Sequence, residues 1–363
     1  MKSYRAAVIG CSRMGGFIDN EVVGSPKMAL PYSHAAGYMA CGRTDLIACA
    51  DVRTDVMAQF GKLYRIPASH QYTDYRELID KEHPEVLSIA TQPEQRAEIT
   101  IYAAEHGVKA IYAEKAMSAS LGEAYAMVEA LEQNGVFFNL GTNRRWSVAY
   151  DQMKALVDSG ELGALKNVII YNNGTLFNTG SHYIDLVMRL NSDQPAVWAQ
   201  GNLRAKDDIF DGDILREDPV GEGLVYFANG VTGYLLVTPR GGDIEVICEN
   251  GTLTAYNDGL EWHLRRREPI DPQGRTGFVD RALPRAAHRQ QHPGPDRRFG
   301  TQPGHGRTIP GRTAHLSGQH RIDLCTDRIP PPGRGQNCSS RAGTQSYVVP
   351  NGTLIETKRV YYD

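Results

Sequence analysis

The sequence YRAAVIGCSRMG, residues 4–15, joins a short apolar run to a turn that begins at Gly10 and closes at Gly15. Gly10 permits a tight turn after a strand. Gly15 permits the next helix to pack closely, so that the amides and dipole at its N-terminus favour a pyrophosphate. Ser12 takes the place of the middle glycine of the G-x-G-x-x-G pattern. The alternative is an ordinary strand-to-helix turn. The stretch predicts a dinucleotide-binding turn whose contacts are Gly10, Ser12, Arg13, Met14 and Gly15.

Short apolar runs alternate with helical stretches from this turn to about residue 140. Such alternation is typical of βαβ units and of a doubly wound parallel sheet, so residues 1–140 are expected to form a nucleotide-binding Rossmann domain. Ser120 and Glu123 predict a capping box at the start of one helix. Glycine and proline interrupt the first crossover, which predicts an inserted loop over residues 18–33. The expected strands are 4–9, 46–51, 86–90, 108–113 and 135–140.

A different pattern begins at residue 141, where strand-like runs follow one another with tight turns. Ala228-Asn229-Gly230 is typical of a hairpin turn. Helices are expected over 148–158 and near 180–190. The region 141–363 therefore predicts a second α/β domain with a mostly antiparallel open sheet. Its expected strands are 165–172, 196–203, 221–228, 231–238, 243–248 and 252–256.

The segment 282–345 fits neither pattern, because it holds ten Arg, no Lys and no Glu and lacks a sustained apolar period. It cannot bury enough apolar surface to offset the entropy of ordering. Three interpretations are a basic tail that binds nucleic acid, a long loop, or a stretch of gene read out of frame. We favour the third, because residue usage changes abruptly near Leu283 and reverts near Tyr347. The last residues, 346–363, predict a strand and turn.

Composition excludes several classes of protein. The chain has 363 residues, a net charge of −3 and six cysteines without metal-binding spacing. Such a balance gives no reason to expect a nucleic-acid or membrane partner, and no third ligand supports a metal. The N-terminus runs directly into the first strand, and no apolar run approaches the length of a membrane span. These features predict a cytoplasmic globular protein without a metal.

Two charged residues stand at the end of the second expected strand and just after it. Asp51 ends that strand, where a carboxylate can bind the adenosine ribose hydroxyls and repel a 2′-phosphate. Arg53 could instead hold that phosphate. The alternative is an aspartate that caps the next helix beside a solvated arginine. These residues favour NAD, with NADP as the open alternative.

A lysine and a histidine are the candidate catalytic groups. Lys115 closes the fourth strand in the sequence YAEK, at the same sheet edge as the glycine turn, where its ammonium can bind a substrate hydroxyl and lower the pKa of a base. Asn178, His182 and Asp185 have offsets of four and three, which place them on one side of the helix near 180–190. A histidine near its ordinary pKa of ~6.5 suits proton removal at neutral pH. The alternatives are a surface lysine and a histidine satisfied in the core.

The succession of motifs resembles the glucose-fructose oxidoreductase/inositol dehydrogenase/MocA (Gfo/Idh/MocA) family over residues 4–281. The matching motifs are the glycine turn, SIATQP at 88–93, AEK at 113–115, NRRW at 143–146 and GSHYID at 180–185. The resemblance implies NAD(P)-dependent chemistry at a sugar or polyol hydroxyl, with Lys115 and His182 at active-site positions. It also implies a homodimer or homotetramer through the second sheet. The motifs add Thr91, Gln92, Pro93, Glu114 and Asn143 as cofactor contacts.

Three positions depart from this family pattern. Ala116 replaces the usual proline after Glu-Lys, and Arg96 stands where a histidine is common. Asn178 occupies the place of an aspartate that helps to relay the proton, and an amide cannot accept that proton. His182 would then deliver it to solvent.

The expected function is hydride transfer between nicotinamide and a hydroxyl carbon of a sugar, polyol or sugar acid. His182 takes the hydroxyl proton, Lys115 stabilises the alkoxide, and Asn178 and Asp185 orient the substrate or the histidine. Arg144 and Arg145 could favour an acidic or phosphorylated sugar, although one of them could only support the domain junction. The alternatives are a sugar lyase or hydrolase that retains NAD, and a cofactor-binding protein without catalysis.

Overall fold

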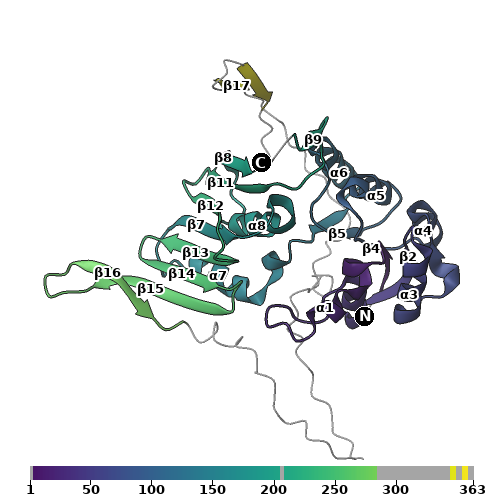
Figure 1. Ribbon diagram of the computed structural model, residues 1–363, viewed down its shortest axis with the longest axis horizontal. Coiled ribbons are helices and arrows are strands. Elements are labelled where there is room, and N and C mark those ends of the chain that lie inside the picture. The colour runs from purple at the N-terminus through teal and green to yellow at the C-terminus, as the bar shows by residue number, and fades with distance from the viewer. Residues whose placement is uncertain (1–2, 205–207, 284–343, 349–353, 359–363) are drawn as a thin grey trace, which may run out of the picture. The chain divides into compact units, whose positions relative to one another are not determined.

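The computed structural model describes residues 3–204, 208–283, 344–348 and 354–358. The described residues before 284 form one compact unit that contains two large sheets and a two-stranded ribbon (Figure 1), and the short hairpin near the C-terminus belongs to a separate unit. The boundary predicted at residue 140 stays a prediction, because both sheets lie in the same unit. Among the described residues, no helix is both long and apolar enough to cross a bilayer.

The N-terminal sheet has six strands in the order β3-β2-β1-β4-β5-β6, and every neighbouring pair is parallel. Strands β4 and β5 are buried along their whole length, as expected of a parallel sheet covered on both faces. Strand order reverses between β1 and β4, which is where such folds bind ligands at the carboxyl ends of the strands. The strands are β1 Tyr4–Ile9, β2 Thr44–Ala50, β3 Gln71–Tyr72, β4 Val86–Ile89, β5 Ala110–Ala113 and β6 Phe137–Leu140.

Helices cover both faces of this sheet. Residues of α4, α5 and α6 pack on one face, and residues of α2 and α3 pack on the other. The capping box predicted at the start of α6 is formed in part. Ser120 Oγ accepts from the Glu123 amide at 3.1 Å, whereas Glu123 Oε2 accepts from the amide of Ala119, not of Ser120, at 2.9 Å. The helices are α1 Asp19–Val22, α2 His34–Ala40, α3 Thr54–Tyr64, α4 Tyr75–Glu82, α5 Pro93–Glu105 and α6 Leu121–Gln133, with a 3₁₀ turn η2 at Ala68–His70.

The first crossover differs from a regular βαβ unit. A five-residue π-helix, η1 (Arg13–Phe17), and the four-residue α1 follow the glycine turn in place of one long helix. Of the loop expected over 18–33, residues 19–22 instead form α1, and residues 23–33 form the loop. Ser33 caps α2 by accepting from the Ala36 amide. The helix dipole at the turn is therefore that of about one helical turn, smaller than the sequence predicted.

The second sheet has eight strands in the order β16-β15-β14-β13-β7-β12-β11-β8. All neighbouring pairs are antiparallel except β7 and β12, which confirms a mostly antiparallel sheet. The strands are β7 Leu165–Asn172, β8 Ala196–Arg204, β11 Val220–Phe227, β12 Thr232–Val237, β13 Asp243–Cys248, β14 Gly251–Tyr256, β15 Glu261–Pro269 and β16 Thr276–Arg281, and a separate two-stranded ribbon comprises β9 Phe210–Asp211 and β10 Ile214–Leu215.

Two helices pack against the second sheet and form its core (Figure 1). They are α7 (Val148–Asp158) and α8 (Ser181–Leu190), and both match the predicted helices. A 3₁₀ turn, η3 (Asn143–Trp146), links the two sheets, and a π-helical turn, η4 (Leu176–Gly180), precedes α8. These two turns carry most of the candidate site residues of this half.

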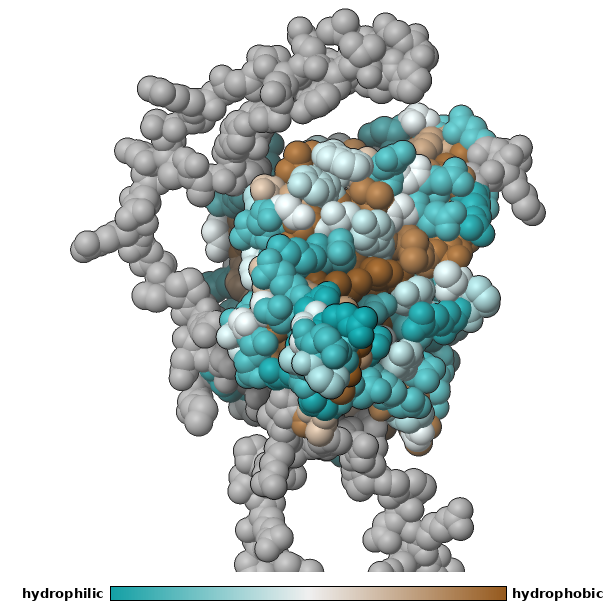
Figure 2. All heavy atoms as spheres, turned by 90° about the vertical axis from the view of Figure 1, so that its left-hand side faces the viewer, coloured by the Kyte–Doolittle hydropathy of each residue, from teal (hydrophilic) through white to brown (hydrophobic). Residues whose placement is uncertain are grey.

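Apolar side chains remain exposed on the edge strand β8, whose residues are exposed throughout. They include Val197, Trp198 and Leu203. Figure 2, which views the molecule from the side of the β15–β16 ribbon, shows brown apolar surface between hydrophilic areas. Self-association through this sheet stays a prediction.

The C-terminal strands β17 (Thr344–Val348) and β18 (Leu354–Lys358) pair antiparallel, as the strand-and-turn pattern predicted. Their connecting turn lies outside the described residues. The segment 282–345, predicted to be irregular and out of frame, also lies outside them except at its first two and last two positions.

Candidate active site

Three cavities share lining residues and follow one another along the carboxyl edge of the N-terminal sheet. The first, of about 630 Å³, lies beside Gly10, Asp51 and Arg53. The second, of about 420 Å³, shares Ser12, Ala90, Thr91 and Gln92 with the first and extends to Lys115. The third, of about 210 Å³, shares Lys115 and Asn178 with the second and ends at His182. The three cavities form one track from Asp51 to His182.

The glycine turn lies along this track, where Gly10 lines the first cavity. Gly10 has a φ of +91°, and a Cβ there would lie 2.7 Å from the Ala90 carbonyl carbon. A Cβ on Gly15 would lie 1.9 Å from the Gly10 carbonyl oxygen. Both glycines are therefore required for backbone conformation and close approach, as the dinucleotide-binding turn predicts. The cradle fits a pyrophosphate-containing ligand.

Asp51 ties the end of β2 to the glycine turn. Its Oδ2 accepts from the Cys11 amide at 2.8 Å, and its Oδ1 accepts from the Arg53 amide at 2.9 Å. The Arg53 guanidinium folds back to the same carboxylate. Each carboxylate oxygen keeps further acceptor capacity, so Asp51 can still bind ribose hydroxyls in the first cavity.

Glu114 is buried at the end of β5 and pairs with His34. Glu114 Oε1 lies 3.0 Å from His34 Nε2, and His34 stacks on the Tyr112 ring. Burial alone would raise the pKa of Glu114, but the hydrogen bond and charge of His34 lower it below its ordinary value. The pair fastens the start of α2, and with it the end of the 18–33 loop, to the strand that carries Lys115.

Lys115 lies between the second and third cavities. Its Nζ donates to Asn178 Oδ1 at 2.5 Å. Burial lowers the pKa of Lys115, the Glu114 charge opposes this shift, and the Arg96 charge adds to it. A partly desolvated ammonium next to a neutral amide is well placed to donate to a substrate oxygen.

Arg96 holds the Lys115 segment in place, a role that the sequence did not predict. It is buried, and its guanidinium donates to the carbonyl oxygens of Thr91 and Ala116. Burial lowers the pKa of Arg96 to about 10, so it remains charged at neutral pH. The arginine joins the end of β4 to the residue that follows Lys115.

His182 lines the third cavity together with Lys115, as predicted. Its pKa differs from the prediction. Burial lowers it to about 3, and the charges of Arg144 and Lys115 add to the shift. Its Nδ1 is buried and has no hydrogen-bond partner among the described residues. The imidazole is therefore neutral at neutral pH, and no carboxylate orients it.

Asn178 is positioned by Asp218, another residue that the sequence did not single out. Asp218 accepts from Thr175 Oγ1 at 2.6 Å and from the Phe177 and Asn178 amides, both at 2.8 Å. These contacts fasten η4, so the Asn178 amide oxygen faces Lys115. Asn178 thus orients the lysine, whereas the sequence suggested the substrate or the histidine.

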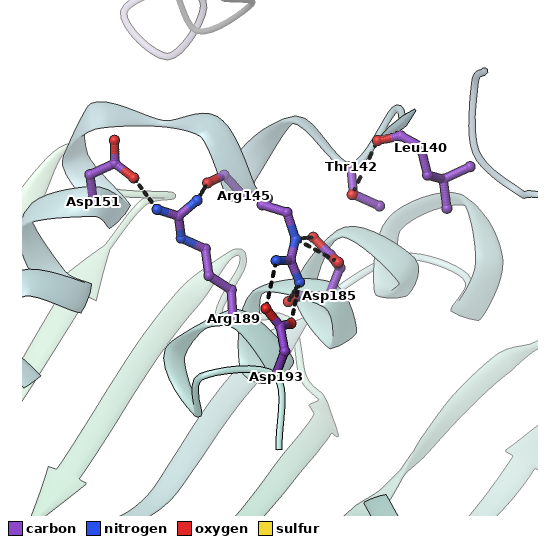
Figure 3. A network of polar contacts seen from close by, with 7 residues as sticks. All are labelled: Leu140, Thr142, Arg145, Asp151, Asp185, Arg189 and Asp193. Carbon is purple, nitrogen blue, oxygen red and sulfur yellow. Dashed lines mark hydrogen bonds and ion pairs between the residues drawn. The ribbon is translucent and has the colours of Figure 1, made fainter. Parts of the chain in front are cut away.

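Asp185 and Arg145 do not line the third cavity. This differs from the orienting role predicted for Asp185, whereas for Arg145 it agrees with the alternative that one of the two arginines only supports the junction. Arg145 Nε lies 2.9 Å from both Asp185 oxygens, and its Nη2 lies 2.7 Å from Asp193 Oδ1. Arg189 donates to the Arg145 carbonyl oxygen and to Asp151 (Figure 3). This network fastens η3 to α8. Helical periodicity predicted the face of the helix on which Asp185 lies, but it could not predict that Arg145 would be its partner.

Arg144 and Asp258 also line the third cavity. Arg144 Nε and Nη2 donate to Asp258 Oδ1 and Oδ2 at 2.8 and 2.6 Å. Tyr150 also donates to Asp258 Oδ1, at 2.9 Å. Asn143, predicted to contact the cofactor, lies in this cavity and donates to Tyr32 OH at 2.8 Å. The 18–33 loop thus reaches the third cavity through Tyr32.

The remaining predicted cofactor contacts are distributed along the track. Gly15 underlies the turn, and no described cavity is lined by it. Arg13, Met14, Pro93 and Glu114 line the second cavity. Within residues 3–204 and 208–283, no group of three histidine, cysteine or acidic side chains could hold a metal ion. The prediction of a metal-free site stays untested.

The fold and the track define a nucleotide-binding protein with a Rossmann-like parallel sheet, a second, mostly antiparallel sheet and a lysine–histidine cavity at the edge of the first sheet. The sequence model of the oxidoreductase family with an NAD-binding Rossmann fold matches residues 4–142. This match confirms the resemblance to the Gfo/Idh/MocA oxidoreductases over residues 4–142 and the NAD-binding Rossmann character of that part of the chain.

Individual relatives agree with this assignment. Inositol 2-dehydrogenase of Salmonella typhimurium is 33% identical over 101 residues, which cover 28% of this chain and 30% of that protein. An oxidoreductase from Agrobacterium radiobacter, solved with NAD⁺, L-tartaric acid and magnesium, has a TM-score of 0.57 and 17% identity, and the match covers 77% of this chain and 80% of that one. Levoglucosan dehydrogenase in complex with NADH has a TM-score of 0.59 and 19% identity, with 78% and 80% covered.

The extent of these matches limits what they establish. The matched part of this chain spans less than a third of the inositol dehydrogenase. The structural likeness extends over most of the described chain and establishes the fold.

Proposed function

We propose that the chain transfers a hydride between NAD and a hydroxyl carbon of a sugar or polyol. The observation that supports this most strongly is that Lys115 and a neutral His182 line the same 210 Å³ cavity, at the end of a track that begins at the glycine turn. Sites for drug-sized ligands measure ~300–1,000 Å³, so a cavity of this size suits one monosaccharide-sized substrate.

The first and second cavities would bind different halves of the dinucleotide. Gly10, Ser12 and Asp51 would hold the adenosine and pyrophosphate part of the dinucleotide in the first cavity. Met14, Pro93 and Glu114 line the second cavity, which would receive the nicotinamide half. When bound, the nicotinamide supplies the hydride acceptor. The Asp51 carboxylate favours NAD over NADP, because a 2′-phosphate would be repelled there.

The substrate oxygen is handled by the lysine and the histidine. Lys115 Nζ, held by Asn178, donates to the hydroxyl oxygen and stabilises the negative charge that develops on it. The neutral imidazole of His182 accepts the hydroxyl proton. Because Arg144 and Lys115 disfavour an imidazolium, the proton passes promptly to solvent. Neither Asn178 nor another described residue at Nδ1 can relay it.

NADH production from a panel of sugars, inositols and sugar acids tests this function. We expect stoichiometric NADH from at least one of these substrates with NAD, and a lower kcat/KM with NADP. Turnover without net NADH would instead indicate the lyase or hydrolase alternative. Cofactor binding with neither reaction would indicate a non-catalytic protein.

The lowered pKa of His182 should be visible in the dependence of kcat/KM on pH. Because the pKa of His182 is about 3, kcat/KM should stay level on the acid side down to about pH 5. A histidine at its ordinary pKa of ~6.5 would lose most of its activity there. An acid limb centred near that value, and absent from a His182 variant, would contradict this prediction.

The same shift has a consequence for stability. The folded-state pKa of His182 lies below the unfolded value, so the unfolded chain binds more protons between about pH 3 and ~6.5. His182 therefore lowers the stability of the fold as the pH decreases through that window. Above ~6.5 it has no such effect.

A further inference from the structure

We propose that Lys27 and Arg144 form an anion-binding subsite in the third cavity, and that this subsite takes the carboxylate of a sugar acid. The inference rests on the proposed hydride transfer and narrows the substrate class of the same site. Sequence reasoning left open whether Arg144 or Arg145 contacts the substrate, and it gave no role to Lys27.

Positive charge exceeds negative charge around the third cavity. Lys27, Lys115 and Arg144 are the cations among its described lining residues, and Asp258 is the one carboxylate. Burial raises the pKa of the two lining tyrosines, so neither adds a negative charge. Three cations and one carboxylate leave an excess of two positive charges around a space of about 210 Å³. Because screening at physiological salt extends over ~8 Å, a ligand in so small a cavity experiences this excess, which a carboxylate reduces and a neutral group does not.

The electrostatic surroundings of His182 agree with this count. Burial is the main cause of its lowered pKa, and Arg144 and Lys115 each lower that pKa further, by more than Glu114 or Asp258 raises it. Positive charge therefore outweighs negative charge at the imidazole too. An environment that disfavours an imidazolium favours an anion in the same cavity.

Arg144 is fixed in place and keeps donors for a ligand. Its Nε and Nη2 donate to the two Asp258 oxygens at 2.8 and 2.6 Å, and its guanidinium lies 4.3 Å from the centre of the Tyr183 ring. Its Nη1 makes no hydrogen bond to the described residues and is not fully buried. Because the side chain is already ordered, donation from Nη1 to a carboxylate costs little conformational entropy, and the hydrogen bond is charge-assisted.

Arg145, the neighbouring arginine, lacks this capacity. Its Nε donates to Asp185, and both of its Nη atoms donate to Asp193. It is also absent from the lining of the third cavity. Of the two arginines, Arg144 is therefore the one that can contact a substrate there.

Lys27 supplies a second cation from a separate element, the loop at residues 23–33. It lines the third cavity, and its ammonium makes no hydrogen bond or ion pair with another described residue. The loop is fastened beside the cavity, because Asp19 accepts from the Tyr32 amide at 2.8 Å and Asn143 donates to Tyr32 OH at 2.8 Å. A flexible ammonium at this position can follow an anion bound by Arg144.

Matched pairs of substrates test the inference on the intact protein. Glucose with glucuronate, and galactose with galacturonate, differ mainly in the group at C6. With NAD present, we expect kcat/KM to be at least tenfold higher for the acid of each active pair. Most of this difference should lie in KM, because the subsite binds a group that does not react. A preference for the neutral member in the wild-type protein would overturn the proposal without affecting the proposed hydride transfer.

Variants of the two cations test the subsite itself. Arg144→Gln leaves Asp258 uncompensated, so the acid-to-neutral ratio of kcat/KM should fall by about tenfold or more. Lys27→Gln should lower the ratio by about two- to fivefold, because the lysine is exposed and solvent screens its charge. Lys27→Arg should keep the ratio. Lys62→Gln, at an exposed lysine of α3 outside the three cavities, is the matched control. An unchanged ratio in either folded glutamine variant of the subsite would overturn the proposal.

Binding measurements keep the test decisive if turnover fails. If no sugar or sugar acid yields NADH, the proposed function fails, and titration with the same pairs in the presence of NADH gives the affinity ratio directly. Tighter binding of the acids supports the anion subsite, whereas tighter binding of the neutral members, or no binding of either, overturns it. The ratios in the wild-type and Lys27→Gln proteins decide even if Arg144→Gln does not fold.

Discussion

Lys115→Ala is expected to lower turnover by about 10³-fold while leaving NAD affinity nearly unchanged. The ammonium donates into the cavity where negative charge would develop, and removal of one such donor costs ~10²–10³ in rate. The residues expected to bind adenosine lie in the first cavity, which Lys115 does not line.

Steady-state NADH formation and calorimetric titration with NAD measure the two effects separately. Lys109→Ala, an exposed residue directly before β5, is the matched control, because it removes the same charge near the opposite end of the strand. Equal losses of turnover and of NAD affinity would mean that Lys115 is a structural residue.

His182→Ala is expected to lower turnover by ~10²–10⁴-fold, the usual contribution of a general base. Its pKa of about 3 makes the imidazole a weak base, so the lysine must lower the pKa of the hydroxyl for the transfer to proceed. The truncation also leaves space that free imidazole could fill, and added imidazole should restore part of the rate.

His263→Asn, on the exposed face of β15, serves as the control for general loss of histidine. Thermal unfolding of both variants checks that the fold is intact. A folded His182→Ala protein with wild-type turnover would show that the proton leaves by another route.

The elements that the sequence predicted correctly are those with a run or a periodic face of buried apolar side chains. The apolar runs of β1, β4 and β5 and the periodicity of α7 and α8 are local signals, and each element lies within a few residues of its expected range. β15 was missed because its alternating side chains are mostly exposed and include Arg265, Arg266 and Arg267. β3 was missed because two residues carry no pattern.

The candidate site was predicted in part. Lys115 and His182 could be brought together from sequence, because one ends a strand of a parallel sheet and the other belongs to a motif of the family that the chain resembles. Asp258 and Asp218 escaped prediction because each lies in a loop without a motif and acts through contacts far along the chain. The pKa of His182 depends on burial and on Arg144, which tertiary structure alone determines.

Arg145 and Asp185 show a further limit. Their motif positions suggested a role in the reaction for Asp185 and, as one of two alternatives, a substrate contact for Arg145. In the structure, the Arg145 guanidinium pairs with Asp185 and with Asp193 (Figure 3). A carboxylate and a guanidinium in a family motif can be retained to fasten one helix to another. Sequence spacing does not distinguish this role from contact with a substrate.

A double-mutant cycle tests the central claim most directly: that Lys115 and His182 act together on one substrate hydroxyl. Single-turnover NADH formation is measured for Lys115→Ala, His182→Ala and the double variant, each saturated with NAD. Groups that act as a unit are strongly non-additive, so we predict that the double variant is little slower than the slower single variant. A double variant whose loss equals the product of the two single losses would contradict the claim.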